Sequence, residues 1–276
     1  MGSTEVKKEK CVIGVFDSGI GGLTAMRDLV RILPQEKIIY FGDTARAPYG
    51  SHSKEVIQKY SLQDQRFLLS KNIRAELIAC GTVTSTSYDI LSANTDIPVF
   101  GIIDAAARKI AGMPKNKKVL VLATEATVKT GAYFKSIKAL SPDIEIIEKA
   151  CPRFVPLIEN GYGTPENSVM NQVVADTLQP YLEFDPDIVV LGCTHYPVIR
   201  ENIAKVFPSA EIVEPGKEAD IEMAGYLAAN NMLTEGDPGE LEIYVSQYTE
   251  AFEAVCRNFF GSETKYTIYQ IDIEKY

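Results

Sequence analysis

The chain has 276 residues, of which 46% are hydrophobic and 24% charged, a composition ordinary for a globular protein with two modest domains. Its formal net charge of −9 argues against nucleic acid or an anionic membrane surface as a partner, because both require basic patches. No apolar run approaches the roughly 20 residues that span a bilayer, and the polar residues 1–10 lack the apolar core of a signal peptide. We therefore expect a cytoplasmic protein with no membrane partner and no nucleic-acid partner.

Short apolar runs alternate with amphipathic stretches along nearly the whole chain. Buried strands are predicted at 11–16, 37–42, 76–80, 97–102, 118–124, 144–148, 187–193, 210–214 and 266–273. Helices are predicted at 22–33, 54–70, 130–140, 166–183, 217–231 and 248–260. Strand, helix and strand at this spacing indicate βαβ units, so we expect an α/β fold with mainly parallel sheets flanked by helices.

Two halves of the chain resemble one another faintly. VIGVFDSG (12–19) and VLVLATEA (119–126) are each a strand that ends in a polar pair. ELIACGT (76–82) and VVLGCTH (189–195) are each a strand that ends in cysteine and threonine. Ligands of parallel sheets bind beyond the carboxyl ends of the strands. We therefore expect two similar domains whose strand ends face one cleft, with the active site in that cleft.

Two loops after predicted strands have the composition of ligand-binding loops. In FDSGIGGLTAM, Asp17 and Ser18 precede a glycine-rich turn and a helix, and such a turn allows close approach of an anionic ligand. Its spacing is neither that of a dinucleotide-binding loop nor that of a Walker loop. GDTARAPYG could offer the Tyr49 phenol and the N–H groups around Gly50 to a carboxylate. For both loops an ordinary connection between elements stays an alternative.

The five cysteines are odd in number and contain no CxxC pair; they are Cys11, Cys80, Cys151, Cys193 and Cys256. With only His52 and His195 as histidine ligands, neither a disulfide framework nor a metal site is expected.

Cys80 and Cys193 are best interpreted together. A single buried cysteine is usually a small hydrophobic residue, but here two thiols end similar strands of two similar halves. Thiols titrate near pH 8.5 and can be tuned downward, so they can remove or deliver a proton near neutrality. Asp17 could activate one of them, and His195 the other. One thiol on each side of a cleft suits a reaction that takes a proton from one face of a carbon and returns it to the other, which is racemisation.

Five segments carry a resemblance to a known family. In order they are DSGIGGLT, YFGDTARAPYG, AC-x-T, ACPRFVPLIENG and LGCTHYP. In this combination the chain resembles the cofactor-independent glutamate racemases over nearly its whole length, and GCTHYP separates that group from the related aspartate racemases. The resemblance implies interconversion of L- and D-glutamate, which supplies D-glutamate for bacterial peptidoglycan.

The resemblance also implies site residues and domain boundaries. Cys80 and Cys193 would be the catalytic bases, supported by Asp17, His195 and Glu159. The glutamate site would be lined by Asp17, Ser18, Tyr49, Gly50, Gly81, Thr82, Thr124, Thr127 and Thr194. One domain would comprise 1–101 plus 211–276, and 102–210 would form the second domain. No cofactor is expected, since the two thiols replace pyridoxal phosphate in handling the Cα proton, although spacing alone leaves a lysine Schiff base open. We also expect a homodimer.

Two motifs depart from the family pattern. ACGTVTS has Gly81 where the family has an asparagine whose amide contacts the substrate, and ATEAT has Ala123 and Ala126 in place of glycines. Restoring asparagine at 81 should improve glutamate binding unless the neighbouring positions have adapted to glycine. A racemase of another amino acid or related compound, with a pocket enlarged at Gly81, is therefore an alternative. A non-catalytic amino-acid-binding protein is a second alternative, which the presence of both thiols disfavours.

Overall fold

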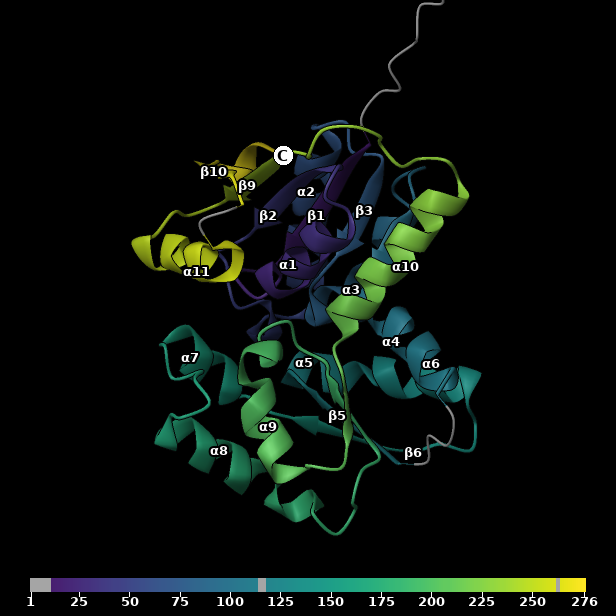
Figure 1. Ribbon diagram of the computed structural model, residues 1–276, viewed down its shortest axis with the longest axis vertical. Coiled ribbons are helices and arrows are strands. Elements are labelled where there is room, and N and C mark those ends of the chain that lie inside the picture. The colour runs from purple at the N-terminus through teal and green to yellow at the C-terminus, as the bar shows by residue number, and fades with distance from the viewer. Residues whose placement is uncertain (1–10, 114–117, 262–263) are drawn as a thin grey trace, which may run out of the picture.

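Two parallel sheets organise the chain in the computed structural model, which describes residues 11–113, 118–261 and 264–276 (Figure 1). The first sheet has the strand order β10-β9-β2-β1-β3-β4 and is formed by β1 (Val12–Asp17), β2 (Lys37–Gly42), β3 (Ala75–Ile78), β4 (Val99–Gly101), β9 (Leu241–Val245) and β10 (Tyr266–Gln270). The second sheet has the order β6-β5-β7-β8 and is formed by β5 (Lys118–Ala123), β6 (Glu145–Ala150), β7 (Ile188–Leu191) and β8 (Glu211–Val213). The prediction of two α/β domains with parallel sheets is confirmed.

Helices surround both sheets. They are α1 (Leu23–Ile32), α2 (Lys54–Leu69), α3 (Gly81–Ser92), α4 (Ile102–Ala111), α5 (Glu125–Thr130), α6 (Ala132–Leu140), α7 (Phe154–Glu159), α8 (Ser168–Leu178), α9 (Arg200–Val206), α10 (Pro215–Ala229) and α11 (Glu250–Phe260). Short 3₁₀ turns lie at Tyr49–Ser51, Gln179–Tyr181, Tyr196–Ile199 and Ile273–Lys275. Within the described ranges, no helix is long and apolar enough to cross a membrane.

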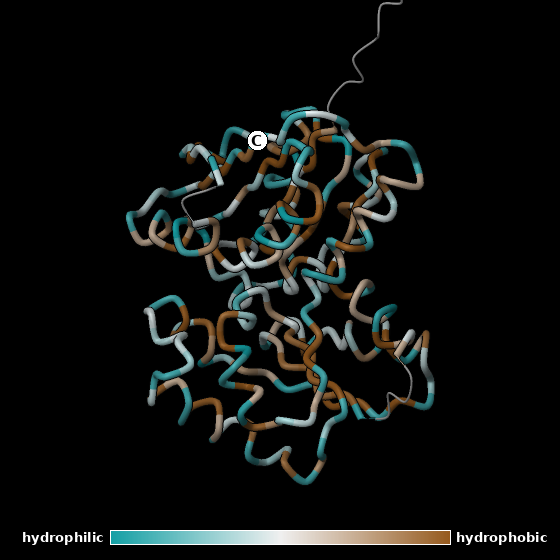
Figure 2. The backbone as a smooth tube through the Cα atoms, viewed as in Figure 1, coloured by the Kyte–Doolittle hydropathy of each residue, from teal (hydrophilic) through white to brown (hydrophobic). Residues whose placement is uncertain are grey.

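Alternation along β1 explains how the first sheet receives helices on both faces. Ile13 and Val15 pack in one cluster with residues of α1, α10 and α11, whereas Phe16 packs in another with residues of α2 and α3. The hydropathy view shows the same apolar strands enclosed by more polar helices and loops (Figure 2). Because every strand pair in both sheets is parallel, the carboxyl ends of neighbouring strands meet at one edge of each sheet.

Six of these helices and strands were not predicted from sequence, namely α3, α4, α5, α7, α9 and β9. The strand β9 is only five residues long, but it lies between β2 and β10 and extends the first sheet. The helix α3, GTVTSTSYDILS, is rich in serine and threonine, which are weak helix formers. Its hydroxyls bond back to carbonyls of the preceding turn, for example Thr86 to Thr82, and its buried face packs against α2.

The domain boundaries at 101 and 211 stay a prediction. β4 ends at Gly101, and the C-terminal strands β9 and β10 join the sheet of β1 to β4. β8, at Glu211–Val213, pairs with β7 in the second sheet. A division that follows the sheets would therefore fall after Val213 rather than before Glu211.

Candidate active site

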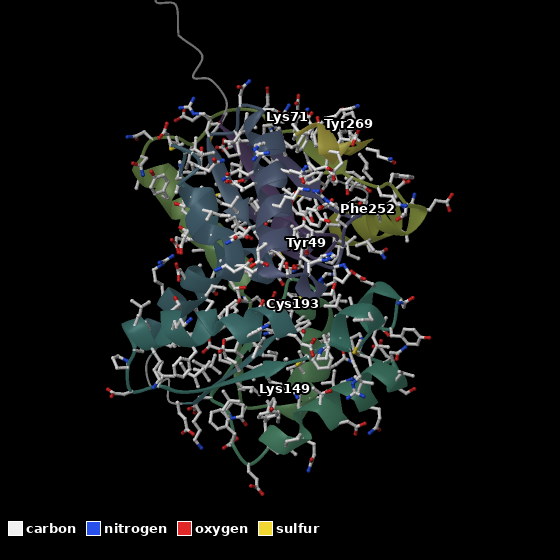
Figure 3. All side chains as sticks on the ribbon, turned by 180° about the vertical axis from the view of Figure 1, so that it is seen from behind. Tyr49, Lys71, Lys149, Cys193, Phe252 and Tyr269 are labelled. Atoms are coloured by element: carbon white, nitrogen blue, oxygen red, sulfur yellow. The ribbon has the colours of Figure 1, made fainter. Side chains whose placement is uncertain are left out.

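A cavity of about 300 Å³ lies where the carboxyl ends of β3 and β7 approach one another, and both predicted bases line it. Cys80 follows β3 and is the N-cap residue of α3, while Cys193 follows β7. Figure 3 shows Cys193 and Tyr49 at the junction of the upper and lower halves of the molecule. The lining residues predicted from sequence are Ser18, Tyr49, Gly50, Cys80, Gly81, Thr82, Thr124, Glu159, Cys193, Thr194 and His195.

The Cys80 thiol is enclosed and held by a hydroxyl. Its Sγ lies 3.4 Å from the Ser18 Oγ, and the residue is 4% exposed. Burial, and after it the nearby charge of Asp17, raise the pKa of Cys80 to about 12, against hydrogen bonds with Ser18 and the Val83 N–H that lower it. An added positive charge in the cavity would favour its thiolate form.

Cys193 has a histidine beside it. The Cys193 Sγ lies 3.7 Å from the His195 Nδ1, and the His195 Nε2 lies 3.0 Å from the Glu159 Oε1. Burial lowers the pKa of His195, but the contacts with Cys193 and Glu159 outweigh burial and raise it to about 10. At neutral pH this arrangement therefore presents an imidazolium to the sulfur of Cys193.

Asp17 lies behind the cavity and organises its neighbours. The residue is fully buried; its Oδ1 accepts from the Thr194 hydroxyl at 3.1 Å, and its Oδ2 accepts from the Gly19 N–H at 2.9 Å. The structure thus joins Asp17, at the end of β1 in the first half, to a threonine that follows Cys193 in the second half.

Three threonines also bridge the two halves. The Thr82 Oγ1 lies 3.1 Å from the Thr124 Oγ1, which is 2.9 Å from the Thr127 Oγ1. Thr124 is the N-cap of α5 and accepts from the Thr127 N–H. Thr127 is fully buried and is not one of the cavity-lining residues. It therefore contacts the lining residue Thr124 rather than the cavity itself.

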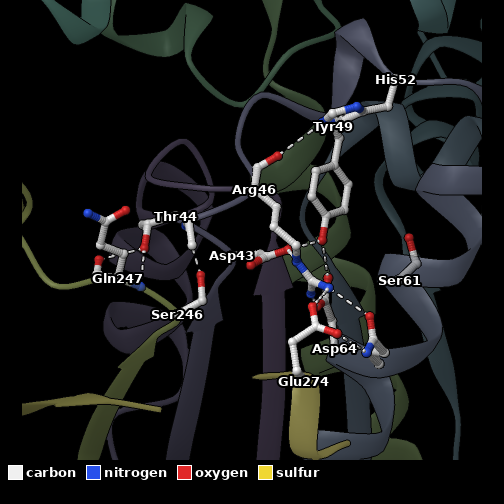
Figure 4. A network of polar contacts seen from close by, with 12 residues as sticks. Asp43, Thr44, Arg46, Tyr49, His52, Ser61, Asp64, Ser246, Gln247 and Glu274 are labelled. Atoms are coloured by element: carbon white, nitrogen blue, oxygen red, sulfur yellow. Dashed lines mark hydrogen bonds and ion pairs between the residues drawn. The ribbon is translucent and has the colours of Figure 1, made fainter. Parts of the chain in front are cut away.

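Tyr49 lines the cavity, but its phenol does not face a ligand there. The hydroxyl donates to Asp43 and lies 2.8 Å from the Asp64 Oδ2. Arg46 Nη2 in turn lies 3.1 Å from the Asp64 Oδ1, and Arg46 also contacts Glu274 (Figure 4). In this structure the carboxyl groups of Asp43 and Asp64 therefore already engage the phenol that the sequence suggested could be offered to a ligand.

Gly81 leaves no space for a side chain. A Cβ built on it would lie 2.4 Å from the Gly192 carbonyl oxygen, under the 3.0 Å that real Cβ contacts respect. Asparagine at this position therefore clashes with the backbone of the other half. The close approach of the Gly192 carbonyl therefore indicates that the surroundings of Gly81 have adapted to glycine.

Several lining residues were missed by the sequence analysis, namely Pro48, Ser51, Glu125, Cys151, Pro152, Val155, Pro156, Asn160 and Tyr196. Cys151 directly follows β6, but proline rather than threonine comes after it, so the cysteine-and-threonine pattern that selected Cys80 and Cys193 passed over it. The lining residues within the described ranges include no lysine or arginine. All five cysteines are free, and the described residues contain no group of three or more histidine, cysteine, aspartate or glutamate side chains that could hold a metal ion.

Comparison with known proteins gives one consistent result. The profile of the family described as Asp/Glu/Hydantoin racemase matches residues 13–219. The chain is 36% identical to a glutamate racemase of Geobacter metallireducens over 264 residues, covering 95% of this chain and 97% of the relative. It is 38% identical to glutamate racemase 2 of Caldanaerobacter subterraneus over 265 residues, covering 96% and 98%. The crystal structure of Francisella tularensis glutamate racemase in complex with D-glutamate superimposes with a TM-score of 0.90 at 34% identity, covering 97% of this chain and 99% of that one.

Proposed function

Because the chain belongs to the Asp/Glu/hydantoin racemase family, we propose that it interconverts L- and D-glutamate with Cys80 and Cys193 as the two bases. The observation that carries this proposal is that both thiols line one small cavity from different sheets. Its volume of about 300 Å³ suits a small amino acid.

In the proposed reaction each cysteine handles one proton. For L-glutamate, the Cys193 thiolate takes the Cα proton, and the electron pair of that bond stays on Cα, delocalised into the adjoining carboxylate. The Cys80 thiol then gives its proton to the opposite face and becomes a thiolate. D-glutamate reacts in the reverse sense, so no other reactant is consumed. Each proton transfer is a general acid–base step.

The surroundings of the two sulfurs support this assignment. The His195 imidazolium, oriented by Glu159, stabilises a thiolate at Cys193. At Cys80 the helix N-terminus and Ser18 favour the thiolate, and the ammonium group of bound substrate adds the positive charge that burial otherwise requires.

The described lining has no lysine or arginine, and the His195 imidazolium lies beside Cys193, so neutral donors must supply most of the contacts to the two carboxylates. We propose that Ser18, Gly50, Thr82, Thr124 and Thr194 supply hydroxyl and backbone N–H groups, and that Gly81 and Tyr49 contribute backbone only. Asp17 and Thr127 act through Thr194 and Thr124, which they hold in place.

The test is exchange at Cα. The protein is incubated in D₂O with L-glutamate, D-glutamate and other amino acids, and loss of the Cα proton is followed by NMR together with inversion of optical rotation. Exchange and inversion of glutamate support the proposal. Exchange of another amino acid alone identifies a different racemase, and no exchange with any of them indicates a binding protein.

Place and assembly belong to the same proposal. We propose a cytoplasmic homodimer that supplies D-glutamate for peptidoglycan, and thus for the cell wall and cell shape, on the basis of the similarity to glutamate racemases. Sedimentation of the purified chain measures the dimer, and depletion of the protein with rescue by added D-glutamate measures the cellular role.

A further inference from the structure

Two glycines that adjoin the proposed bases lie against one another. Gly81 follows Cys80, and Gly192 precedes Cys193. A Cβ on Gly81 would lie 2.4 Å from the oxygen and 3.5 Å from the carbon of the Gly192 carbonyl. The backbones of the two halves therefore meet closely one residue away from each thiol.

Neighbouring atoms prevent the Gly192 peptide from shifting away from Gly81. Its N–H donates to the Leu122 carbonyl at 2.7 Å. A Cβ on Gly192 would lie 2.8 Å from that same oxygen and 2.9 Å from Cε2 of Tyr133, whose side chain is fully buried. The Gly192 peptide is thus enclosed between the Tyr133 ring, β5 and Gly81.

Gly81 is held as firmly on its own side. It begins α3, whose first turn closes through the bond from the Thr84 N–H to the Cys80 carbonyl at 2.8 Å. The Thr84 hydroxyl bonds to the Cys80 carbonyl at 2.9 Å and lies 3.3 Å from the Ile78 carbonyl, which ties this turn to β3. Moving Gly81 therefore moves Cys80, just as moving Gly192 moves Cys193.

We propose that the contact between Gly81 and Gly192 sets the separation of the two thiols, which makes Gly81 a positioning residue; this rests on the proposed two-thiol function. A methyl group at 81 must displace one backbone by about 0.6 Å to restore the 3.0 Å limit. Racemisation needs both sulfurs aligned on one Cα, so it is sensitive to that displacement. A reaction that needs only one sulfur is not.

The experiment compares a two-thiol and a one-thiol reaction in Gly81→Ala. Racemisation of glutamate is the first. Elimination from each enantiomer of 3-chloroglutamate is the second: one thiolate takes the Cα proton, the Cα–Cβ double bond forms as chloride leaves with its electron pair, and water hydrolyses the resulting enamine to 2-oxoglutarate and ammonium. Gly225→Ala is the matched control, since Gly225 lies in α10 with nothing within 4 Å of its Cβ position.

We expect Gly81→Ala to lower kcat for racemisation ~10–100-fold while kcat for elimination from the better enantiomer changes less than about threefold. Weaker substrate binding through the Gly81 backbone would appear in KM of both reactions. Gly225→Ala should leave both rates as in the unmodified chain. Equal losses of both reactions, or no loss of either, overturn the inference. If Gly81→Ala does not fold, Gly192→Ala displaces the other member of the pair and must show the same separation of rates. If the unmodified chain does not racemise glutamate, the proposed function and this inference are both overturned. If the unmodified chain racemises glutamate and Gly81→Ala does so at the same rate, only the inference is overturned.

Discussion

Replacing Glu159 with glutamine should lower the pKa of His195 and move the alkaline limb of the activity profile to lower pH. The Glu159 Oε1 lies 3.0 Å from the His195 Nε2, and the histidine side chain is 8% exposed. Glutamine keeps the size of the side chain and a hydrogen-bond acceptor but removes the charge. The variant therefore isolates the electrostatic contribution of Glu159 from its packing.

The magnitude follows from the kind of hydrogen bond that is lost. A bond to a charged group contributes ~1.5–3 kcal/mol and one between neutral groups ~0.5–1.5 kcal/mol, so the difference is about 1 kcal/mol. The Glu159 side chain is 34% exposed, and solvent reduces this value. Since 1.36 kcal/mol corresponds to one pH unit, we expect the pKa of His195 to fall from about 10 by roughly half a unit to one unit.

Two measurements check this prediction. The chain has only two histidines, so the imidazole NMR signals can be assigned readily and His52 serves as an internal reference. The pH dependence of kcat/KM for L-glutamate reports the same group, because loss of the imidazolium proton removes the charge beside Cys193. Glu166→Gln, on the exposed segment between α7 and α8, is the control. An unchanged pKa of His195, or an alkaline limb that moves to higher pH, would refute the reasoning.

Three further outcomes are expected. Cys80→Ala and Cys193→Ala should each reduce racemisation by at least ~10²–10⁴-fold with the far-UV circular dichroism unchanged, because each lacks one base; near-normal activity in either would contradict the two-thiol mechanism. Cys80→Ser and Cys193→Ser should eliminate chloride from opposite enantiomers of 3-chloroglutamate, with the remaining Cys193 acting on the L form and the remaining Cys80 on the D form; a shared preference would show that the thiols do not flank the substrate. Burial raises the pKa of Glu76 from 4.5 to about 7, so its proton is bound more tightly in the folded chain, and this contribution to stability is lost as pH rises through 7. The difference in free energy of urea unfolding between Glu76→Gln and the unmodified chain should therefore favour the variant more at pH 8 than at pH 5, by up to roughly 3 kcal/mol. The same difference at both pH values would contradict this prediction.

The sequence by itself determined those features that depend on neighbours along the chain. Apolar runs followed by polar pairs predicted the ends of β1, β3, β5 and β7, and with them the positions of both thiols, because strand periodicity and turn composition are local properties. Cys80 and Cys193 could therefore be selected from five cysteines before their surroundings were known. The short β9 and the threonine-rich α3 escaped because their intrinsic preferences are weak, and pairing with β2 and packing against α2 stabilise them.

The tertiary structure alone decided how residues distant in sequence meet. It bonded the Tyr49 hydroxyl to Asp43 of the same loop and placed it 2.8 Å from Asp64 of α2. It also placed the Gly192 carbonyl where a side chain at 81 would begin, a contact between positions 111 residues apart. Sequence showed that Gly81 departs from a family pattern, and suggested a larger pocket. Only the packing of the two halves reveals a filled space instead, because excluded volume is a property of atoms in contact and not of neighbours along the chain.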